Sequence, residues 1–269
     1  MTESYRPDTL EEALKMMHEK RLIPIAGATD LFIRSRNWQG ASRAMKGDTI
    51  FIGHLPELRH LIDDDDYYRI GAAVTQTEMA NCSFMPEYAR LVVSQMGNPA
   101  IRNAATIGGN LANAARVADL LPLFYCLDAK VVLASFENIR IMPIDEFETG
   151  KYATAIEPNE LIVEILVPKV SVKRYMYVKT GARKASILSK ASFLALETDH
   201  SVQMVIGAVN DTVIRSKELE AKFYENREVN PALEGYKQLL NSSDDTRSTK
   251  QYREKVAMNF LEKWLEGCL

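Results

Sequence analysis

The sequence predicts a mixed α+β protein, and three observations support this prediction. The chain has 269 residues, 46% of them apolar and 26% charged, which suits a globular protein with a sizeable core. Short helix and strand patterns alternate irregularly up to about residue 169. After that point three strand patterns follow one another, and helical patterns fill the rest. We therefore expect one unit over residues 1–169 and a second over residues 170–269, the second an antiparallel sheet followed by helices.

The first unit begins with a helix over residues 8–20, because a capping signal precedes an apolar stripe. Asp8 or Thr9 can cap its first turn, and Glu11 or Glu12 can reach back toward the cap.

Strands and helices then interleave. The stretch "LIPIA" (22–26) predicts a short strand, and Pro24 favours a sheet edge. Branched and aromatic residues predict the other strands, and apolar periodicity predicts the helices. The other strands of the first unit are expected at 49–53, 67–74, 130–135 and 161–168, and its helices at 75–82, 86–97 and 119–129, with a loop over 142–160.

The second unit is expected to contain strands at 174–180, 186–197 and 203–210, followed by helices from residue 215. Upstream, the run "DDDD" (63–66) separates two apolar segments. It predicts a solvated hairpin turn, with a cation site as the alternative.

Composition excludes several classes of function. A net charge of −3 argues against a nucleic-acid or anionic-membrane surface. No apolar run is long enough to span a membrane, and the acidic N-terminal stretch is unlike a signal peptide. The three cysteines are odd in number and widely spaced, which fits a reducing cytoplasm. They cannot by themselves build a cysteine-ligated iron–sulfur cluster or a four-cysteine zinc site, and we expect no metal site.

Two glycine-containing stretches carry the chemistry that the sequence offers. "IPIAGATDL" (23–31) and "ATIGGN" (105–110) each run from apolar into polar residues. Such turns can expose successive main-chain N–H groups to anionic oxygens. The fingerprints GxGxxG and GxxxxGK[ST] are absent. Tight turns without a ligand are the alternative, as are a helix cap for Asp119 and a surface charge for Lys179.

Longer motifs then point to a family. The stretches "AGATDL", "IRNAATIGGNLANAARVADLLPLFYCLDAKVVL", "ELIVEILVP", "YVKTGARKAS" and "VIGAVNDTVIR" occur in this order. The combination resembles the FAD-binding subunit of molybdenum hydroxylases, a family that includes xanthine, nicotinate and carbon monoxide dehydrogenases. The resemblance runs from "YRPDTLEEAL" to at least Arg215.

The resemblance implies a fold and a set of FAD contacts. The first unit would be an FAD-binding domain of the vanillyl-alcohol-oxidase type, made of two α+β subdomains, and the second a small three-stranded domain with helices. One glycine motif would wrap the FAD pyrophosphate, Asn113 and Asp119 would contact the nucleotide end, and Ile162 and Lys179 would lie near the flavin ring. The implied contact residues are Pro24, Ile25, Ala26, Gly27, Ala28, Thr29, Asp30, Leu31, Thr106, Gly109, Asn110, Asn113, Asp119, Ile162 and Lys179.

The resemblance also implies electron transfer. A molybdopterin subunit would oxidise the substrate, a [2Fe–2S] subunit would relay electrons, and FAD on this chain would deliver them to NAD or another acceptor. FAD is the only cofactor expected on this chain, and no residue is assigned as a catalytic acid or base.

Two departures from the family pattern concern the cofactor site. The second glycine of the usual "AGGTDL" is Ala28, which costs about 1 kcal/mol or more if that position requires a positive φ. The usual "ASPAAD" reads "AARVAD", so that Ala115 and Arg116 replace serine and proline. Arg116 then either contacts a phosphate or is a surface or subunit-facing charge.

Two other functions stay open on the sequence alone. One is a self-contained FAD oxidoreductase on the same fold, which would need its own acid or base. The other is a degenerate scaffold subunit that no longer binds FAD.

Overall fold

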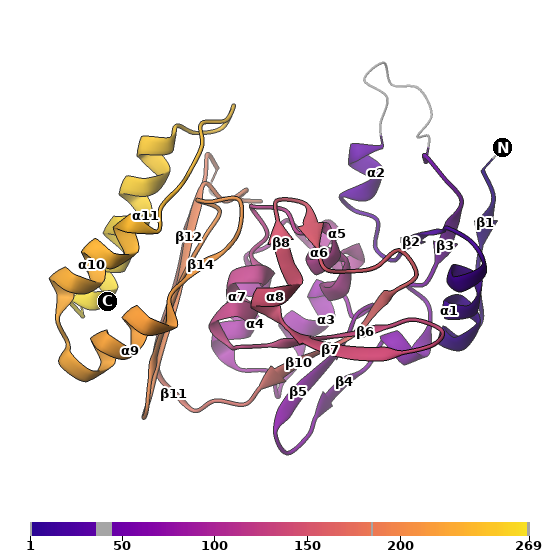
Figure 1. Cartoon of the computed structure of the whole chain (residues 1–269), viewed down its shortest axis with the longest axis horizontal. Coiled ribbons are helices and arrows are strands. Elements are labelled where there is room, and N and C mark those ends of the chain that lie inside the picture. Colours follow the sequence, from indigo (N-terminus) through magenta and orange to yellow (C-terminus); the bar gives the residue numbers. More distant parts are fainter. Residues whose placement is uncertain (1, 36–44, 184, 268–269) are drawn as a thin grey trace.

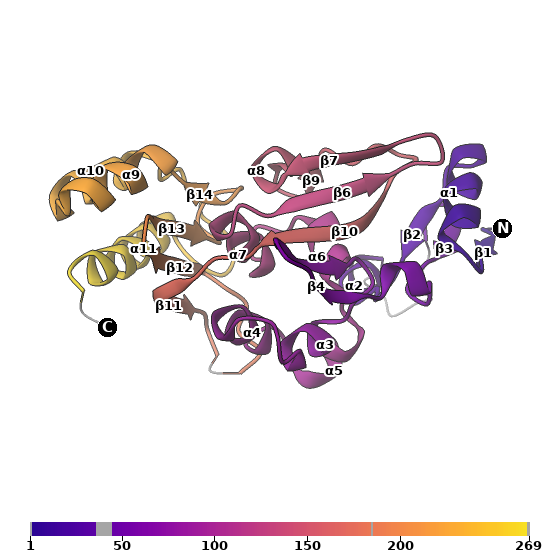
Figure 2. The ribbon, with the colours of Figure 1, turned by 90° about the horizontal axis from the view of Figure 1, so that it is seen from below.

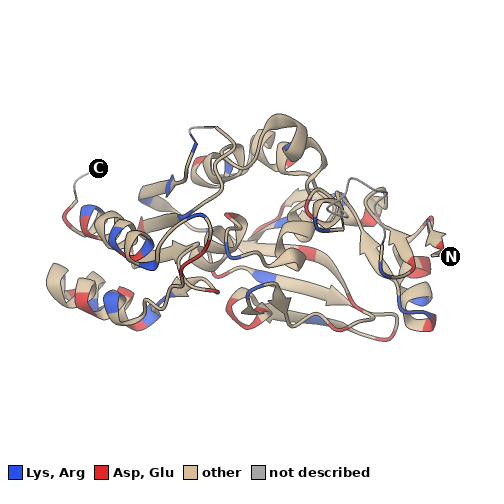
Figure 3. Cartoon of the chain, turned by 90° about the horizontal axis from the view of Figure 1, so that it is seen from above, with Lys and Arg blue, Asp and Glu red and all other residues tan. Residues whose placement is uncertain are grey.

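The computed structural model describes residues 2–35, 45–183 and 185–267. Its elements form a mixed α+β arrangement in which the N-terminal strands and the C-terminal helices lie at opposite ends (Figure 1). Within the described ranges, no helix combines the length and the apolar character that crossing a bilayer requires. Basic and acidic positions are interspersed along the ribbon in the view from above (Figure 3), as the small net charge suggests.

The N-terminal end is a small parallel sheet with strand order β1-β3-β2, covered by helix α1. Thr9 caps α1 by accepting from the main-chain N–H of Glu12, as predicted. Pro24 lies in β2 at the sheet edge, where its missing N–H leaves no ladder bond unmade. The elements are β1 (Ser4–Tyr5), α1 (Leu10–Glu19), β2 (Ile23–Ile25) and β3 (Thr49–Phe51), with the short helix α2 (Leu31–Arg34) after β2.

A five-stranded antiparallel sheet with order β4-β5-β10-β6-β7 forms the middle of the molecule (Figure 2). The aspartate run turns the hairpin between β4 and β5, where Asp63 pairs with Tyr68, as predicted. Strand β7 was not predicted. It pairs with β6 at the other edge, and its alternate residues Ile139 and Ile141 are exposed. The strands are β4 (Leu61–Asp63), β5 (Tyr67–Gly71), β6 (Lys130–Ala134), β7 (Ile139–Pro143) and β10 (Leu161–Pro168).

Several short helices pack beside this sheet. Those that share one large hydrophobic core with it are α3 (Gln76–Asn81), α4 (Glu87–Ser94), α6 (Ile107–Asn113), α7 (Leu120–Cys126) and α8 (Ile144–Phe147). Two others do not: η1 (Pro56–Leu58), whose Leu58 belongs to the core of the N-terminal sheet, and α5 (Pro99–Ala104), which has no buried residue. The expected loop over 142–160 is wrong in part, because it contains α8 and the two-stranded pair β8 (Glu148–Gly150) and β9 (Ala153–Thr154). These elements are too short to produce a clear periodicity.

The chain after Pro168 forms an antiparallel sheet with order β11-β12-β13-β14, covered on its outer face by helices. The predicted three-stranded sheet has a fourth, two-residue strand. Strand β12 is buried on both faces: Phe193 and Ala195 join the core under the C-terminal helices, while Leu194 and Leu196 join the core shared with α7. The elements are β11 (Val172–Thr180), β12 (Ala191–Thr198), β13 (Val202–Gly207), β14 (Ile214–Arg215), α9 (Lys217–Asn226), α10 (Val229–Gln238) and α11 (Lys250–Leu265).

Candidate cofactor site

A cavity of about 550 Å³ lies among the turn after β2, helix α6, the segment that leads into α7, and the loop between β11 and β12. Its size falls within the usual range for small-molecule and cofactor sites. Thirteen of the fifteen predicted contact residues line it: Pro24, Ile25, Ala26, Gly27, Ala28, Thr29, Asp30, Leu31, Thr106, Gly109, Asn110, Asn113 and Asp119. The exceptions are Ile162 and Lys179.

The turn after β2 contributes one wall and contains a left-handed residue. Ala28 has a φ of 55°, so the condition under which alanine was expected to be costly is met. A left-handed residue in a turn helps to bring consecutive main-chain N–H groups to one side, which favours an anion. Gly27 is required for a different reason: a Cβ atom there would lie 1.9 Å from the carbonyl oxygen of Ala104.

The stretch "TIGGN" is not an open turn but the first turn of α6. Its main-chain N–H groups are already bonded: Gly108 donates to the Ala72 carbonyl at 2.9 Å, and Gly109 donates to the Thr106 hydroxyl at 3.1 Å. The expectation that this stretch offers free N–H groups is therefore wrong. The glycines provide clearance instead, because a Cβ atom on Gly108 would lie 2.6 Å from the Cβ of Ala72.

Two buried amide oxygens in the cavity wall have no partner. They are Gln76 Oε1, at the start of α3, and Asn110 Oδ1, in α6. Leaving a buried polar group unpaired costs about 1–3 kcal/mol. Both residues belong to the cavity wall, but the two oxygens themselves are shielded from solvent.

Asp119 and Lys179 form a buried ion pair at one end of the cavity. Lys179 Nζ lies 2.6 Å from Asp119 Oδ2, and Ser189 donates to the other carboxylate oxygen at 2.8 Å. The Lys179 side chain is fully buried, so its reading as a surface charge is wrong. Asp119 stands at the N-terminus of α7 but makes no capping bond, because its carboxylate turns to these partners. Burial, and then the nearby Asp119 carboxylate, raise the pKa of Tyr177 well above its ordinary value.

Ile162 lines a neighbouring cavity of about 450 Å³, whose wall includes apolar residues such as Leu22 and Ile52. The two cavities share several wall residues, among them Pro24, Ala26 and Gly109. The implied layout is therefore wrong in one respect. It assigned Asp119 to the nucleotide end and Lys179 to the flavin end, yet these two side chains are in contact.

Some residues of the cavity wall were not predicted. Arg34, in α2, donates to Asn113 at 3.1 Å and lies over the ring of Tyr152. Arg183 and Ser186 come from the loop between β11 and β12, within the motif stretch "YVKTGARKAS". Because this motif is one of the stretches that carry the family resemblance, the sequence could have identified these two residues. Tyr152 lies in a segment expected to be a loop and gave no signal.

Arg116 does not line the cavity and is not exposed. Its side chain is 5% exposed and points away from the cavity lining, toward Asp245 and Ser243. Both expectations for this residue, a phosphate contact and a surface or subunit-facing charge, are therefore wrong. The reason is a partner 129 positions away in the sequence.

The chemistry of the cavity wall suits binding more than proton transfer. Its described residues include no histidine or cysteine, and the Asp119 carboxylate is already paired. Across the described ranges, no cluster of three or more His, Cys, Asp or Glu side chains is arranged to hold a metal ion.

Comparison with known proteins relates this architecture to a family. Residues 1–170 match the family described as the FAD binding domain in molybdopterin dehydrogenase. The nicotinate dehydrogenase FAD subunit of Eubacterium barkeri is 33% identical over 199 residues, which cover 70% of this chain and 65% of that subunit. The xanthine dehydrogenase FAD-binding subunit of Escherichia coli O157:H7 is 27% identical over 228 residues, 80% of this chain and 77% of that one.

A solved structure shows the same fold. The crystal structure of quinoline 2-oxidoreductase from Pseudomonas putida 86 contains a chain that matches with a TM-score of 0.87, covering 99% of this chain and 96% of that one at 18% identity. The family match confirms the expected α+β fold and the expected cofactor, FAD. Because the family match over residues 1–170 covers more than half of the sequence, the chain belongs to the family of FAD-binding domains of molybdopterin dehydrogenases.

Proposed function

We propose that this chain binds one FAD in the 550 Å³ cavity and the cavity beside it, and serves as the electron-transfer subunit of a multi-subunit molybdopterin-dependent dehydrogenase. Electrons would come from a [2Fe–2S] partner, itself reduced by a molybdopterin subunit, and leave to NAD or another acceptor. Bound FAD supplies the redox chemistry, while the protein supplies binding, orientation and electrostatics.

The observation that carries the proposal is the convergence of the implied contact residues on one cavity. Thirteen of the fifteen line it, although they come from the turn after β2, from the start and body of α6 and from the segment before α7. The wall combines main-chain turns, short polar side chains and two arginines, Arg34 and Arg183, which suits a dinucleotide with an anionic pyrophosphate.

The turn over residues 26–31 is the part of the wall suited to the pyrophosphate. Thr29 adds a hydroxyl donor, and the left-handed Ala28 supports the concave arrangement of main-chain N–H groups. Arg34 and Arg183 add positive charge to the same cavity wall. Gly109 and Ala112 keep the opposite wall free of bulk.

The two cavities suggest how an extended dinucleotide is oriented. We assign the flavin to the end with Asp119 and Lys179, where polar groups can meet the polar edge of the ring system. The apolar cavity with Leu22, Ile52 and Ile162 then receives the adenine, which replaces the flavin contact that the resemblance implied for Ile162. Because Asp119 pairs with Lys179, the pair presents a dipole to the ring and not an isolated positive charge.

The two alternatives have less support. A self-contained flavin oxidoreductase needs an acid or base beside its substrate. The described cavity wall has no histidine or cysteine, its Asp119 carboxylate is paired with Lys179, and its other carboxylate, Asp30, stands at the N-terminus of α2 in the turn assigned to the pyrophosphate. A scaffold without FAD has no need of an open cavity lined by these residues. Ala28 already adopts the left-handed conformation, so replacing glycine has not closed the turn.

The proposal is tested by isolating the chain from its source cell with an affinity tag on its C-terminus. We expect it to carry about one FAD per chain and to co-purify with partners that contain molybdenum and about four irons, as two [2Fe–2S] clusters. Adding the substrate of the complex should bleach the flavin absorbance. A chain that carries FAD, purifies alone and oxidises a substrate alone would overturn the electron-transfer role.

A further inference from the structure

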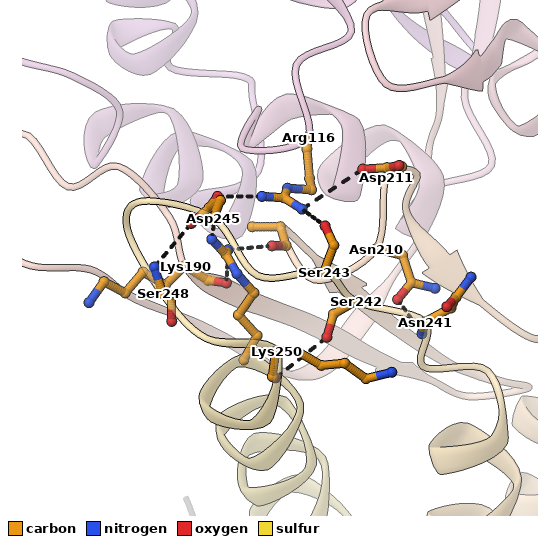
Figure 4. Close-up of polar contacts among 12 residues, drawn as sticks. Arg116, Lys190, Asn210, Asp211, Asn241, Ser242, Ser243, Asp245, Ser248 and Lys250 are labelled. Carbon is orange, nitrogen blue, oxygen red and sulfur yellow. Dashed lines mark hydrogen bonds and ion pairs between the residues drawn. The ribbon is translucent and has the colours of Figure 1, made fainter.

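A network of charges, made of two buried arginines and a partly exposed aspartate, joins the wall of the cofactor cavity to the last helix of the chain. Arg116 lies in the wall segment, residues 115–119, whose neighbours Ala115, Val117, Ala118 and Asp119 line the cavity. Its guanidinium pairs with Asp245 at 2.5 Å and donates to Ser243 at 3.1 Å. Figure 4 shows Arg116, Asp245 and Ser243 pointing toward one another, with Asp211 on the far side of the guanidinium.

Arg253 holds the other side of Asp245. This residue of α11 is fully buried, and its guanidinium lies 2.7 Å from the same carboxylate oxygen. It also donates to the main-chain carbonyls of Lys190 at 2.8 Å and Ala208 at 3.0 Å. Asp245 therefore stands between two arginines, one from the cavity wall and one from the C-terminal helix.

The network returns to the cavity by a second route. Lys190 follows Ser189, whose hydroxyl donates to Asp119. Asp119 and Arg116 are three residues apart on the wall segment. The segment is thus fixed at two points, through Asp119 to β11 and the loop before β12, and through Arg116 to the loop before α11. Arg253 connects both attachments.

We propose that Arg116, Asp245 and Arg253 form a positioning clamp that holds the wall segment in the conformation that receives FAD. This inference rests on the proposed function and extends it to residues that lie outside the cavity. Both arginines are buried and must meet Asp245 in one arrangement, whereas an ion pair with a partly exposed carboxylate adds little net stability. The structural consequence of the clamp is therefore a fixed cavity wall.

The test compares FAD binding by the full chain and by three variants. Arg116→Gln removes the charge, Arg116→Lys keeps it, and Arg215→Gln is the matched control. Arg215 is also buried, pairs with Glu220 and Asp128, and reaches the Tyr125 carbonyl across the same boundary, but it lies outside the cavity wall. FAD affinity is read from flavin fluorescence, the environment of the ring from visible circular dichroism, and stability from urea unfolding.

We expect Arg116→Gln to weaken FAD binding at least about tenfold, or 1.4 kcal/mol, and to change the visible circular dichroism. Arg116→Lys should recover most of the affinity, and Arg215→Gln should stay within about twofold of the parent chain even where it costs stability. If Arg116→Gln does not fold, Asp245→Asn is read in its place, with a loss of several fold expected.

Two results would overturn the clamp. One is unchanged affinity and unchanged circular dichroism in Arg116→Gln or Asp245→Asn. The other is an equal loss of affinity in Arg215→Gln, which would mean that the contact between the two parts of the chain matters only for stability. If the parent chain itself ignores FAD, the proposed function fails, and this outcome is visible before any variant is compared.

Discussion

At the scale of single residues, the turn beneath the cavity contains a strained alanine. Ala28 has a φ of 55°, a region that a side chain with a Cβ atom disfavours by roughly 1–2 kcal/mol. Natural chains retain such strain where the surrounding structure determines the backbone. In this chain the strained residue belongs to the turn that we propose to hold the FAD pyrophosphate.

We predict that Ala28→Gly raises the free energy of unfolding by about 0.5–1 kcal/mol, because relief of strain exceeds the added entropy of the unfolded chain. Urea unfolding measures this. The matched control is Ala221→Gly in the exposed middle of α9, which should lower stability by about 1 kcal/mol. Destabilisation by both substitutions would show that Ala28 is not strained.

The second prediction concerns the buried pair at the end of the cavity. Lys179→Met leaves the Asp119 carboxylate buried with only Ser189 as partner, so it should cost about 3–5 kcal/mol. The double variant Lys179→Met with Asp119→Asn should recover part of this loss, since no unpaired charge remains. Urea unfolding of the two singles and the double gives the coupling energy. Additive losses would contradict a direct interaction.

The sequence predicted the residues that line the cavity better than it predicted the buried ion pairs behind them. Residues 24–31 belong to a contiguous motif, and all of them line the cavity. Arg116 was misplaced because it is buried by a partner distant in sequence, Asp245. The pairing of Lys179 with Asp119 was not foreseen for the same reason. A single sequence contains no signal for such pairings.

At the scale of elements, α6 forms the opposite wall, and its start depends on one threonine. The Thr106 hydroxyl accepts a hydrogen bond from the main-chain N–H of Gly109 and so caps the helix. Gly109 itself lines the cavity and has no side chain to fill it. Gly108 meanwhile lets the helix approach Ala72 of the strand region. The double glycine is thus a packing feature of a helix, which the sequence alone had suggested to be an open turn.

We predict that Thr106→Ala lowers the free energy of unfolding by about 1 kcal/mol through loss of the cap, and that Thr106→Ser retains most of it. The serine variant keeps the hydroxyl oxygen and the alanine variant loses it. The difference between their free energies of unfolding therefore measures the contribution of the capping hydrogen bond. Thermal or urea unfolding of the FAD-free chain provides the measurement. Equal stability of the alanine and serine variants would show that the cap contributes nothing.

Elements with a cap, periodicity or turn signal in the sequence were predicted, and several short elements without one were missed. Helix α1, the three-residue edge strand β2 and the hairpin at the aspartate run were all confirmed. Strands β7 and β14 and helix α8 have five residues or fewer, and their pairing is decided by the sheet they join, not by their own pattern.

At the scale of the whole molecule, the parts before and after Pro168 are joined by a shared core and by buried charges. The core contains residues of α7 together with Leu194 and Val205 of the C-terminal sheet. The division at residue 169 stays a prediction. Asp245 adds a charged contact across this boundary.

Asp245 predicts an acid-sensitive contribution to stability. Burial of the carboxyl opposes its ionisation, but the Arg247 N–H and the Arg253 guanidinium favour it more, and the pKa of Asp245 is lowered to about 2. A lowered pKa stabilises the folded chain above the ordinary value of 3.8, and this contribution is lost as the pH falls toward about 2.

The stability difference between the parent chain and Asp245→Asn should therefore be constant above about pH 5 and smaller at pH 3, by about 0.5 kcal/mol because solvent screens the partly exposed carboxylate. Urea unfolding of both proteins at several pH values measures it. A difference that does not change with pH would mean that this carboxylate titrates as it does in the unfolded chain.

The most direct test of the whole account is an FAD titration of the purified, cofactor-free chain, followed by flavin absorbance and by the amount of flavin released on denaturation. The cavity and the residues that line it predict saturation at one FAD per chain and a higher unfolding temperature in the complex. A chain that remains colourless in excess FAD, with an unchanged unfolding temperature, would contradict the assignment of this cavity as a working flavin site.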